Sequence, residues 1–489
     1  MVALVNNMRK ITIPSVGGKL VSSGQFQNFI ASCILFCCPG IYLAVTGLGA
    51  GGGHPDAYHM ADVTNSLLYA LFTVCGWAGG PILKYLGPRW ALALGATGYP
   101  IYIGGLWYFD NTGKQGFTIF TGAYEGIAAG LLWASTAYIS LSYSCANQKS
   151  QFIATQWTIL AFGSTVGSFI AFGINYHSTS TGVPMAVYII FIIIMACAVL
   201  LAILFIKSPS DVRKSDGTSA LSPSNKTFGQ ELWGLFEAAK DWRLLCLLPA
   251  SFASQSTIAW QSHLNSYYFS LRTRSLNNVL FWVIQFFVPY LFTLILDAKA
   301  LKRRTRGIIG LTIQAVVIMA TLSGELGWIV SKHIDLHDTS PDLDWTQRGY
   351  GGALVLYLLM GIQYGSSIVS VQWCISLLSS DPDKYARYAG LYKGTQAAGM
   401  CVSFGIDAAG VSFLGQGIIY FIFLFVMCAS QLIMTSIFGK ETDRLSTKEH
   451  FTDDKSYIDG VMPSTDTYMN EKTSDELDKK SLPSDQVYV

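Results

Sequence analysis

The chain has 489 residues, of which 51% are hydrophobic and only 13% are charged. Soluble domains carry roughly 25% charged residues, so this composition excludes an ordinary soluble protein and indicates one embedded in a bilayer. The net charge of +2 gives no sign of a nucleic-acid partner. None of the ten cysteines forms a CxxC pair, so we expect neither a metal site nor redox chemistry.

Apolar segments long enough to cross a bilayer, about 20 residues each, recur along the chain. Twelve are predicted, in two groups of six. The first group is 28–47, 61–83, 90–109, 117–140, 152–174 and 184–206. The second group is 244–268, 278–297, 307–330, 350–378, 389–410 and 416–438. The sequence therefore predicts an all-α integral membrane protein.

Polar segments divide the chain around these spans. The predicted parts are a cytosolic tail (1–27), a six-helix half (28–206), a cytosolic central loop (207–242), a second six-helix half (243–438) and a disordered cytosolic tail (439–489). With the N-terminus in the cytosol, most loop lysines and arginines lie on the cytosolic side, as the positive-inside rule requires. Arg272 and Arg274, in an outer loop, are the exception. We expect both termini in the cytosol and the protein in the plasma membrane or an endomembrane.

The link between the second and third spans reads GPILKYLGPR, residues 80–89. Gly80, Gly87 and Arg89 stand at the spacing of the G-x-x-x-D-R-x-G-R-R loop of the major facilitator superfamily. The arrangement of the chain in two six-helix halves also resembles that superfamily. Further strings are similar to the Unc-93-like family, especially its fungal members. They are LGPRWALALGATGYPIYIGGL, GAYEGIAAGLLWASTAYISLSY, LDAKALKRRTRGIIG and SSDPDKYARYAGLYKGTQAAGMCVSFGID.

This resemblance implies the major facilitator fold, with twelve transmembrane helices in two six-helix halves. Its members are linked to transport, to potassium-channel regulation and to trafficking of membrane receptors, and most have no established substrate. Two departures put the usual proton coupling or gating in doubt. Lys84 replaces the acid of the loop, and Gln363 and Tyr364 stand in span ten where fungal relatives often carry an acid.

Lys84 raises a question of its own. In the superfamily, the acid at this position is thought to face the N-terminus of span eleven, where the helix dipole favours a carboxylate. Here that helix opens with Asp381 and Asp383 on either side of a proline, and so supplies its own negative charge. Two interpretations stay open: Lys84 pairs with Asp381 or Asp383 as an inner latch of swapped polarity, or it extends to the cytosolic surface and helps to set the topology.

Ionisable residues at membrane depth usually face the interior of a helix bundle. Glu125, in GAYEGIAAG of span four, is interpreted either as a site for a cation or proton or as a carboxyl that locks helix packing. Asp407, in FGIDAAG of span eleven, is a second interior candidate. Lys393 lies nearer the cytosolic end, where its side chain can extend to the surface. Glu325 lies near the outer end of span nine and is expected to be solvated.

Amides and aromatic side chains are dense in spans seven and ten. This density fits a wall that hydrogen-bonds a small polar solute, and equally a wet cavity in a protein that no longer transports. The predicted solute or ion site comprises Glu125, Trp260, Gln261, His263, Asn265, Gln363, Tyr364 and Asp407. The predicted gating motif comprises Gly80, Lys84, Gly87, Arg89, Asp381 and Asp383.

The first outer loop carries two histidines and two acids, namely His54, Asp56, His59 and Asp62. Their spacing matches no metal site, so we expect an exposed loop and no bound metal. No glycine loop that would cradle a phosphate is present in the sequence, and neither an enzyme, an ATP-driven pump nor a cofactor is expected.

These patterns favour a secondary transporter of an unidentified small solute, working by alternating access with or without a coupling ion. The alternative is a non-transporting regulator or trafficking chaperone of other membrane proteins. The expected partners are the lipid bilayer and the solute or, in the alternative, a second membrane protein. No nucleic acid is expected.

Overall fold

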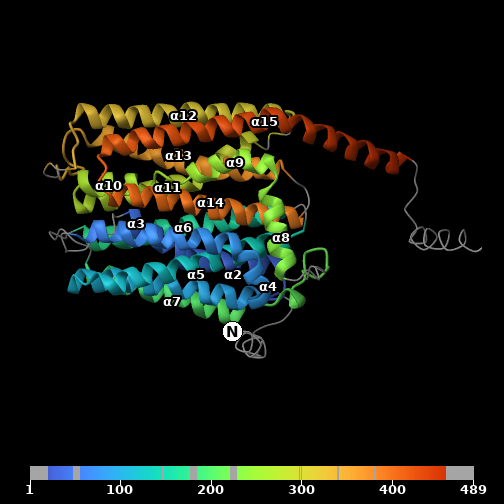
Figure 1. The fold of residues 1–489 in the computed structure, drawn as a ribbon, viewed down its shortest axis with the longest axis horizontal. Coiled ribbons are helices and arrows are strands. Elements are labelled where there is room, and N and C mark those ends of the chain that lie inside the picture. The colour runs from blue at the N-terminus through green and yellow to red at the C-terminus, as the bar shows by residue number, and fades with distance from the viewer. Residues whose placement is uncertain are drawn as a thin grey trace, which may run out of the picture. The chain divides into compact units, whose positions relative to one another are not determined.

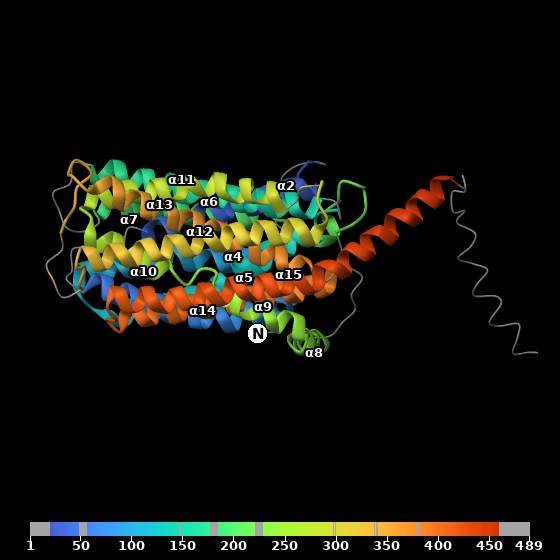
Figure 2. The ribbon, with the colours of Figure 1, turned by 90° about the horizontal axis from the view of Figure 1, so that it is seen from above.

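The computed structural model describes residues 20–458 apart from 48–55, 146–147, 177–183, 221–227, 297, 299, 337, 339–340 and 379–381. The chain divides into two units, Met1–Gly439 and Lys440–Val489. The first unit contains the helix bundle of Figures 1 and 2.

The bundle is all-helical in its described part. The N-terminal half contains α2 (Gly24–Leu35), the π-helix η1 (Phe36–Gly40), α3 (Ile41–Gly47), α4 (Ala57–Thr112), α5 (Gln115–Ser142), α6 (Lys149–Asn175) and α7 (Met185–Phe205). The link between the halves contains the 3-10 helix η3 (Pro209–Asp211) and α8 (Phe228–Ala239). The C-terminal half contains α9 (Trp242–Ala253), α10 (Ile258–Tyr268), α11 (Leu271–Leu296), α12 (Arg303–Ser331), α13 (Tyr350–Ser376), α14 (Pro382–Ala408) and α15 (Phe413–Ile458).

The described helices form twelve membrane spans, as predicted. The helices α2, η1 and α3 together make the first span, α4 makes the second and third, and α9 with α10 makes the seventh. In the described residues, six of these spans contain an 18-residue stretch of high mean hydropathy with at most two charged residues. These are Gly24–Thr46, Gln151–Asn175, Met185–Phe205, Arg303–Ser331, Tyr350–Ser376 and Phe413–Ile437. The other six are the two spans of α4, together with α5, α9–α10, α11 and α14.

The helix α4 turns back on itself at Gly87. Gly87 has φ 72° and ψ 159°, a left-handed conformation that glycine adopts without the clash a Cβ would bring. Pro88 follows and has no N–H to continue the helical hydrogen bonds. Ala57 and Met60, at the start of α4, pack against Phe109, near its end. The predicted loop glycine is therefore the turning point between two antiparallel spans.

We name the two ends of the bundle by one residue each. The Gly87 end is where α5, α7, α11 and α13 finish, and α8 lies across it (Figure 1). The Asp407 end is where α6, α10, α12 and α14 finish. At the Gly87 end, Arg89 Nε donates to the carbonyl of Ile206, the residue that follows α7 (2.5 Å), and Arg304 Nε donates to the Ser436 carbonyl of α15 (3.0 Å).

Asp241 joins two helices at the Gly87 end. As the N-cap of α9, it accepts a hydrogen bond from the backbone N–H of Arg243 (3.0 Å), and its other oxygen accepts one from the Tyr388 hydroxyl of α14 (2.6 Å). The Arg243 guanidinium also donates to both carboxylate oxygens. These hydrogen bonds, that of Arg243 foremost, lower the pKa of Asp241 to about 2.

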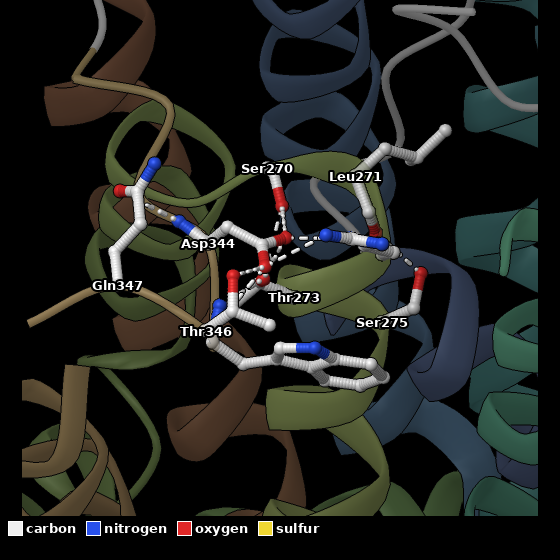
Figure 3. A network of polar contacts seen from close by, with 9 residues as sticks. Ser270, Leu271, Thr273, Ser275, Asp344, Thr346 and Gln347 are labelled. Atoms are coloured by element: carbon white, nitrogen blue, oxygen red, sulfur yellow. Dashed lines mark hydrogen bonds and ion pairs between the residues drawn. The ribbon is translucent and has the colours of Figure 1, made fainter. Parts of the chain in front are cut away.

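Arg272, in the first turn of α11, has a local partner at the Asp407 end, the Asp344 carboxylate labelled in Figure 3. Its Nε and Nη2 donate to the two oxygens of Asp344 at 2.6 and 2.8 Å, and its guanidinium lies 5.7 Å from the centre of the Trp345 ring. The Arg272 hydrogen bonds hold the pKa of Asp344 well below its usual range. Paired in this way, Arg272 contributes little unbalanced charge at this end.

Glycines set the distance between α4 and α5. A Cβ on Gly126 would overlap the Leu68 carbonyl oxygen, and one on Gly130 would lie 2.6 Å from the Cys75 Cβ. Because neither position has room for a side chain, the two helices are in direct backbone contact there.

Candidate functional site

A cavity lies between the two halves of the bundle. It contains about 580 Å³ of free space, counting its open side. Polar and aromatic side chains from both halves line it. The N-terminal half contributes Tyr42, Tyr69, Phe72, Tyr99, Glu125, Trp133 and Trp157, and the C-terminal half contributes Gln255, Tyr364, Lys393 and Gln396. A group bound here therefore contacts both halves at once.

Two helices present one continuous face each to the cavity. On α5 the lining residues are Glu125, Ala129 and Trp133, which follow one another at four-residue steps. On α14 they are Lys393, Gln396, Ala397 and Met400, spaced three, four and seven from the first. This is the spacing of one helix face, so the lining side chains of each helix point in one direction, toward the cavity.

The first and seventh spans, which hold equivalent places in the two halves, are both interrupted beside this cavity. In the first, η1 contains Pro39, which removes a backbone donor and lines the cavity. In the seventh, residues 254–257 form turns between α9 and α10, and Gln255 of that break lines the cavity. Interrupted helices in corresponding positions of two repeats are typical of transporter binding sites.

Glu125 is buried, with 1% of its surface exposed. Its Oε2 has no hydrogen-bond partner among the described residues. A side chain at Gly98 of α4 would overlap this oxygen, so the glycine makes room for the carboxyl. The position combines depth, contact with the cavity and an unused acceptor.

Lys393 turns into the cavity, and the expectation that it extends to the cytosolic surface is wrong. Its Nζ donates to Gln396 Oε1 (3.0 Å) and lies over the Trp133 ring, 4.4 Å from the ring centre. No carboxylate of the described residues forms an ion pair with it. The amide of Gln396 is itself held, because its Nε2 donates to Ser254 Oγ (3.0 Å) and to the Tyr392 hydroxyl (2.9 Å).

Tyr364 also lines the cavity, where its hydroxyl accepts a hydrogen bond from Gln255 Nε2 (2.6 Å). Across the cavity, the Tyr42 hydroxyl donates to Asn65 Oδ1 (3.0 Å) and lies 3.3 Å from that of Tyr69. Hydroxyl and amide groups are thus fixed on both sides of the space.

A second polar cluster joins the halves at the Asp407 end. Asp407 Oδ1 lies 2.7 Å from His263 Nδ1 and accepts from Gln416 Nε2 (2.8 Å), while Oδ2 accepts from the Tyr58 hydroxyl (2.9 Å). Asp62 lies beside them: one ligand atom each from Asp62, His263 and Asp407 fall within 4.8 Å of one another. Two carboxylates and an imidazole are a donor set that suits Zn²⁺. In this structure, hydrogen bonds already use the oxygens of Asp407.

The remaining predicted site residues pack within the C-terminal half and do not line the cavity. Trp260 Nε1 donates to the Phe413 carbonyl (3.1 Å), and Asn265 Nδ2 donates to the Arg274 carbonyl (3.1 Å). Gln363 contacts the Thr257 hydroxyl at 3.5 Å, and Gln261 is buried with 1% exposed. Neighbouring helices satisfy most of these polar groups, so the hypothesis of a seventh-helix wall of amides holds only for Gln255 at the break.

Two expectations about acidic residues are wrong. Glu325 is buried with 1% exposed, because it stands on the same face of α12 as the buried Leu322 and Ile329. Asp62 is buried with 3% exposed, because α4 begins at Ala57 and carries this residue inside the bundle rather than in a loop.

Part of the predicted gating motif lies outside the described residues. Asp381 is one such residue, and the side chains of Lys84 and Asp383 are also outside, as are the surroundings of Gly80. Gly87 makes the turn of α4, and Arg89 makes its contact with the end of α7. Sequence reasoning missed Lys393 and Gln396 as cavity residues. Their helical spacing with Ala397 and Met400 on α14 is the pattern that could have identified them.

Comparison with known proteins gives the family. A family model described as "Ion channel regulatory protein UNC-93" matches residues 59–259. An UNC93-like protein of Schizosaccharomyces pombe is 33% identical over 419 residues, which is 85% of this chain and 82% of that protein. The chain belongs to the UNC-93 family. UNC93-like protein 1 of Arabidopsis thaliana is also 33% identical, over 80% of this chain and 86% of its own length.

Solved structures identify the fold. The Escherichia coli xylose transporter XylE, in a partially occluded inward-open conformation, matches with a TM-score of 0.54 and 15% identity over 85% of this chain and 95% of its own. FucP, a major facilitator superfamily transporter in the outward conformation, matches with a TM-score of 0.52 and 14% identity over 83% and 98%. This UNC-93 family chain is therefore a multi-pass membrane protein with the major facilitator fold, as its resemblance implied.

Proposed function

We propose that this protein is a secondary transporter that moves a small solute across its membrane by alternating access. The observation that carries the proposal is a cavity whose polar lining comes from both halves, beside the interrupted first and seventh spans. A solute bound between two halves meets each side of the membrane in turn as the halves rock against one another. Glu125, with its unused oxygen, is the proposed solute or ion contact from the N-terminal half.

The cluster around Asp407 is the proposed closure at one end of the pathway. It links α4 of the first half to α10 and α14 of the second, so it must break when that end opens. A further link between the halves is the hydrogen bond from Asn175 Nδ2 to Ser275 Oγ (3.1 Å). With both termini in the cytosol, this end faces away from the cytosol.

A latch at the Gly87 end, formed by Lys84 with Asp381 or Asp383, is the matching proposal for the cytosolic side. If charge pairing holds it, Lys84→Asp lowers uptake and the added change Asp381→Lys restores it. Normal uptake by the single variant would leave Lys84 as a topology signal only.

The test of transport uses two buried carboxyls as a matched pair. Both Glu125 and Glu325 are 1% exposed and have an Oε2 without a hydrogen-bond partner among the described residues, but only Glu125 lines the cavity. Metabolites are profiled in intact cells that express the native chain, Glu125→Gln or Glu325→Gln at equal surface amounts. We expect the cellular amount of at least one solute to differ from that in cells without the protein when the native chain or Glu325→Gln is expressed. With Glu125→Gln, that amount should return to the level of cells without the protein.

The result against transport is an identical profile for all three chains and for cells without the protein. A profile that changes equally with Glu125→Gln would remove Glu125 from the pathway while leaving transport in place. The two outcomes therefore separate the activity from the residue.

Regulation of another membrane protein is the second candidate, and the description of the matched family, an ion channel regulatory protein, favours it. Filling the cavity separates the two candidates. Ala397 lines the cavity, so Ala397→Phe obstructs it and should abolish transport. A regulator that acts through its lipid-facing or loop surfaces would keep its partner and its effect in that variant.

A further inference from the structure

We infer that the cavity binds a small organic monoanion, a carboxylate with an aromatic or apolar body, whose charged group sits on the Lys393 ammonium beside Trp133. This inference rests on the proposed function, because it names the class of solute for the same cavity.

The first argument is charge. Lys393 is the only cationic residue among the described residues that line the cavity, and no carboxylate of the described part of the chain pairs with it. Its ammonium has three donors, and the hydrogen bond to Gln396 Oε1 uses one of them. A buried ammonium without a counter-charge is unfavourable. An anion in the cavity would supply that charge and accept from the donors that remain.

The second argument is the support around the ammonium. The Trp133 ring lies 4.4 Å from Nζ and that of Tyr392 lies 5.2 Å from it, so two π-faces favour a cation at this point. Ser254 and Tyr392 hold the Nε2 of Gln396, which leaves its Oε1 directed to Lys393. The charge is therefore positioned before any solute arrives, which lowers the entropic cost of binding.

The third argument concerns the rest of the solute. Beyond the ammonium, the lining is largely aromatic and aliphatic, with Tyr69, Phe72 and Tyr99 among its rings. Flat apolar surfaces of this kind suit an aromatic or apolar body. One lysine balances one negative charge, so a dianion would leave a charge uncompensated in a desolvated site.

The carboxyl of Glu125 does not conflict with an anion at Lys393. Glu125 precedes Trp133 by eight residues on α5, about 12 Å along the helix at 1.5 Å per residue. The two charges therefore lie toward different ends of the cavity. The Oε2 of Glu125 is left to accept a hydrogen bond from a hydroxyl or amine at the far end of the solute.

The test compares three probes of one shape and different charge: benzoate, benzamide and benzylamine. Their equilibrium binding to the purified full chain in lipid nanodiscs is followed by tryptophan fluorescence, since Trp133 and Trp157 line the cavity, and by thermal shift. Lys393→Met removes the charge and Lys393→Arg keeps it. Lys332→Met is the matched control, because Lys332 is exposed beyond the end of α12.

We expect benzoate to bind about tenfold or more tightly than benzamide, since only benzoate supplies a negative charge to pair with the buried ammonium. Lys393→Met should remove that preference, because it weakens the binding of benzoate far more than that of benzamide. Lys393→Arg and Lys332→Met should both keep it. Gel filtration of each variant shows whether it is folded. If Lys393→Met is not folded, the test rests on Lys393→Arg, which should keep the preference for benzoate.

Three results would overturn the inference: equal binding of benzoate and benzamide, tighter binding of benzylamine, or no binding of any probe up to about 10 mM, a weak limit for fragments of this size. Benzoate binding unchanged by folded Lys393→Met would do the same. Binding at equilibrium needs no transport, so charge-selective binding without any uptake would refute the proposed function and leave this inference. Uptake that benzamide inhibits as well as benzoate does would refute this inference and leave transport.

Discussion

Replacing Asp407 with alanine removes the acceptor of three hydrogen bonds that hold α4, α10 and α15 to α14 at one end of the bundle. The Asp407 side chain is fully buried and that of His263 is 12% exposed. After the substitution, the His263 ring nitrogen lacks its partner, and the Tyr58 hydroxyl and the Gln416 amide each lose one hydrogen bond. A buried polar group without a partner costs about 1–3 kcal/mol.

Asp407→Ala should therefore lower the unfolding free energy by about 3 kcal/mol, near the low end of the range for three polar groups that each lose a hydrogen bond. The low end applies because the Gln416 amide still donates to the Val411 carbonyl (2.8 Å), and the Tyr58 hydroxyl still lies 3.4 Å from the Ala259 carbonyl. The assay is reversible unfolding of the purified chain by a denaturing detergent, followed by circular dichroism.

Tyr58→Phe and the double variant complete a cycle around the Tyr58–Asp407 hydrogen bond. We expect a coupling energy of about 1–2 kcal/mol between the two positions, because the bond is partly buried and charge-assisted. An unfolding free energy for Asp407→Ala within about 0.5 kcal/mol of the native value would refute the reasoning, since surface-like substitutions fall in that range. A coupling of zero would show that Tyr58 contributes independently of the carboxylate.

Two further predictions concern packing and pH. Gly126→Ala should cost about 1–3 kcal/mol in the same detergent titration, because its Cβ would overlap the Leu68 carbonyl of α4. Gly104→Ala, where nothing lies within 4 Å of the added atom, should stabilise by up to about 1 kcal/mol, and equal effects at both sites would contradict the contact. The pKa of Asp241 is lowered to about 2 from a usual value near 3.9. Its ionised form therefore stabilises the fold fully when the pH is above that usual value, and this stabilisation is lost as the pH falls through about 2. The difference in melting temperature between the native chain and Asp241→Asn should stay constant from about pH 8 to 5 and shrink below about pH 4, and a difference that varies above pH 5 would point to another group.

The number of spans and their division into two halves were predictable from the sequence. Crossing a bilayer requires about 20 apolar residues in a row, and this requirement is local, so it can be seen without knowing what each helix touches. The burial of Glu125 and Asp407 was predictable for a related reason, since a charge at membrane depth is too costly against lipid and must face the interior. The turn at Gly87 was marked by a glycine and a following proline.

Only the tertiary structure decided which interior polar groups share a space. Lys393 and Glu325 looked like surface residues by their position along a span, yet both are directed inward, because packing against other helices sets the rotation of each helix about its axis. His263 and Asp407 lie 144 positions apart, and no local pattern shows that their side chains meet. Hydropathy is a property of a segment, whereas a cavity between two halves depends on contacts among residues from spans far apart in the chain.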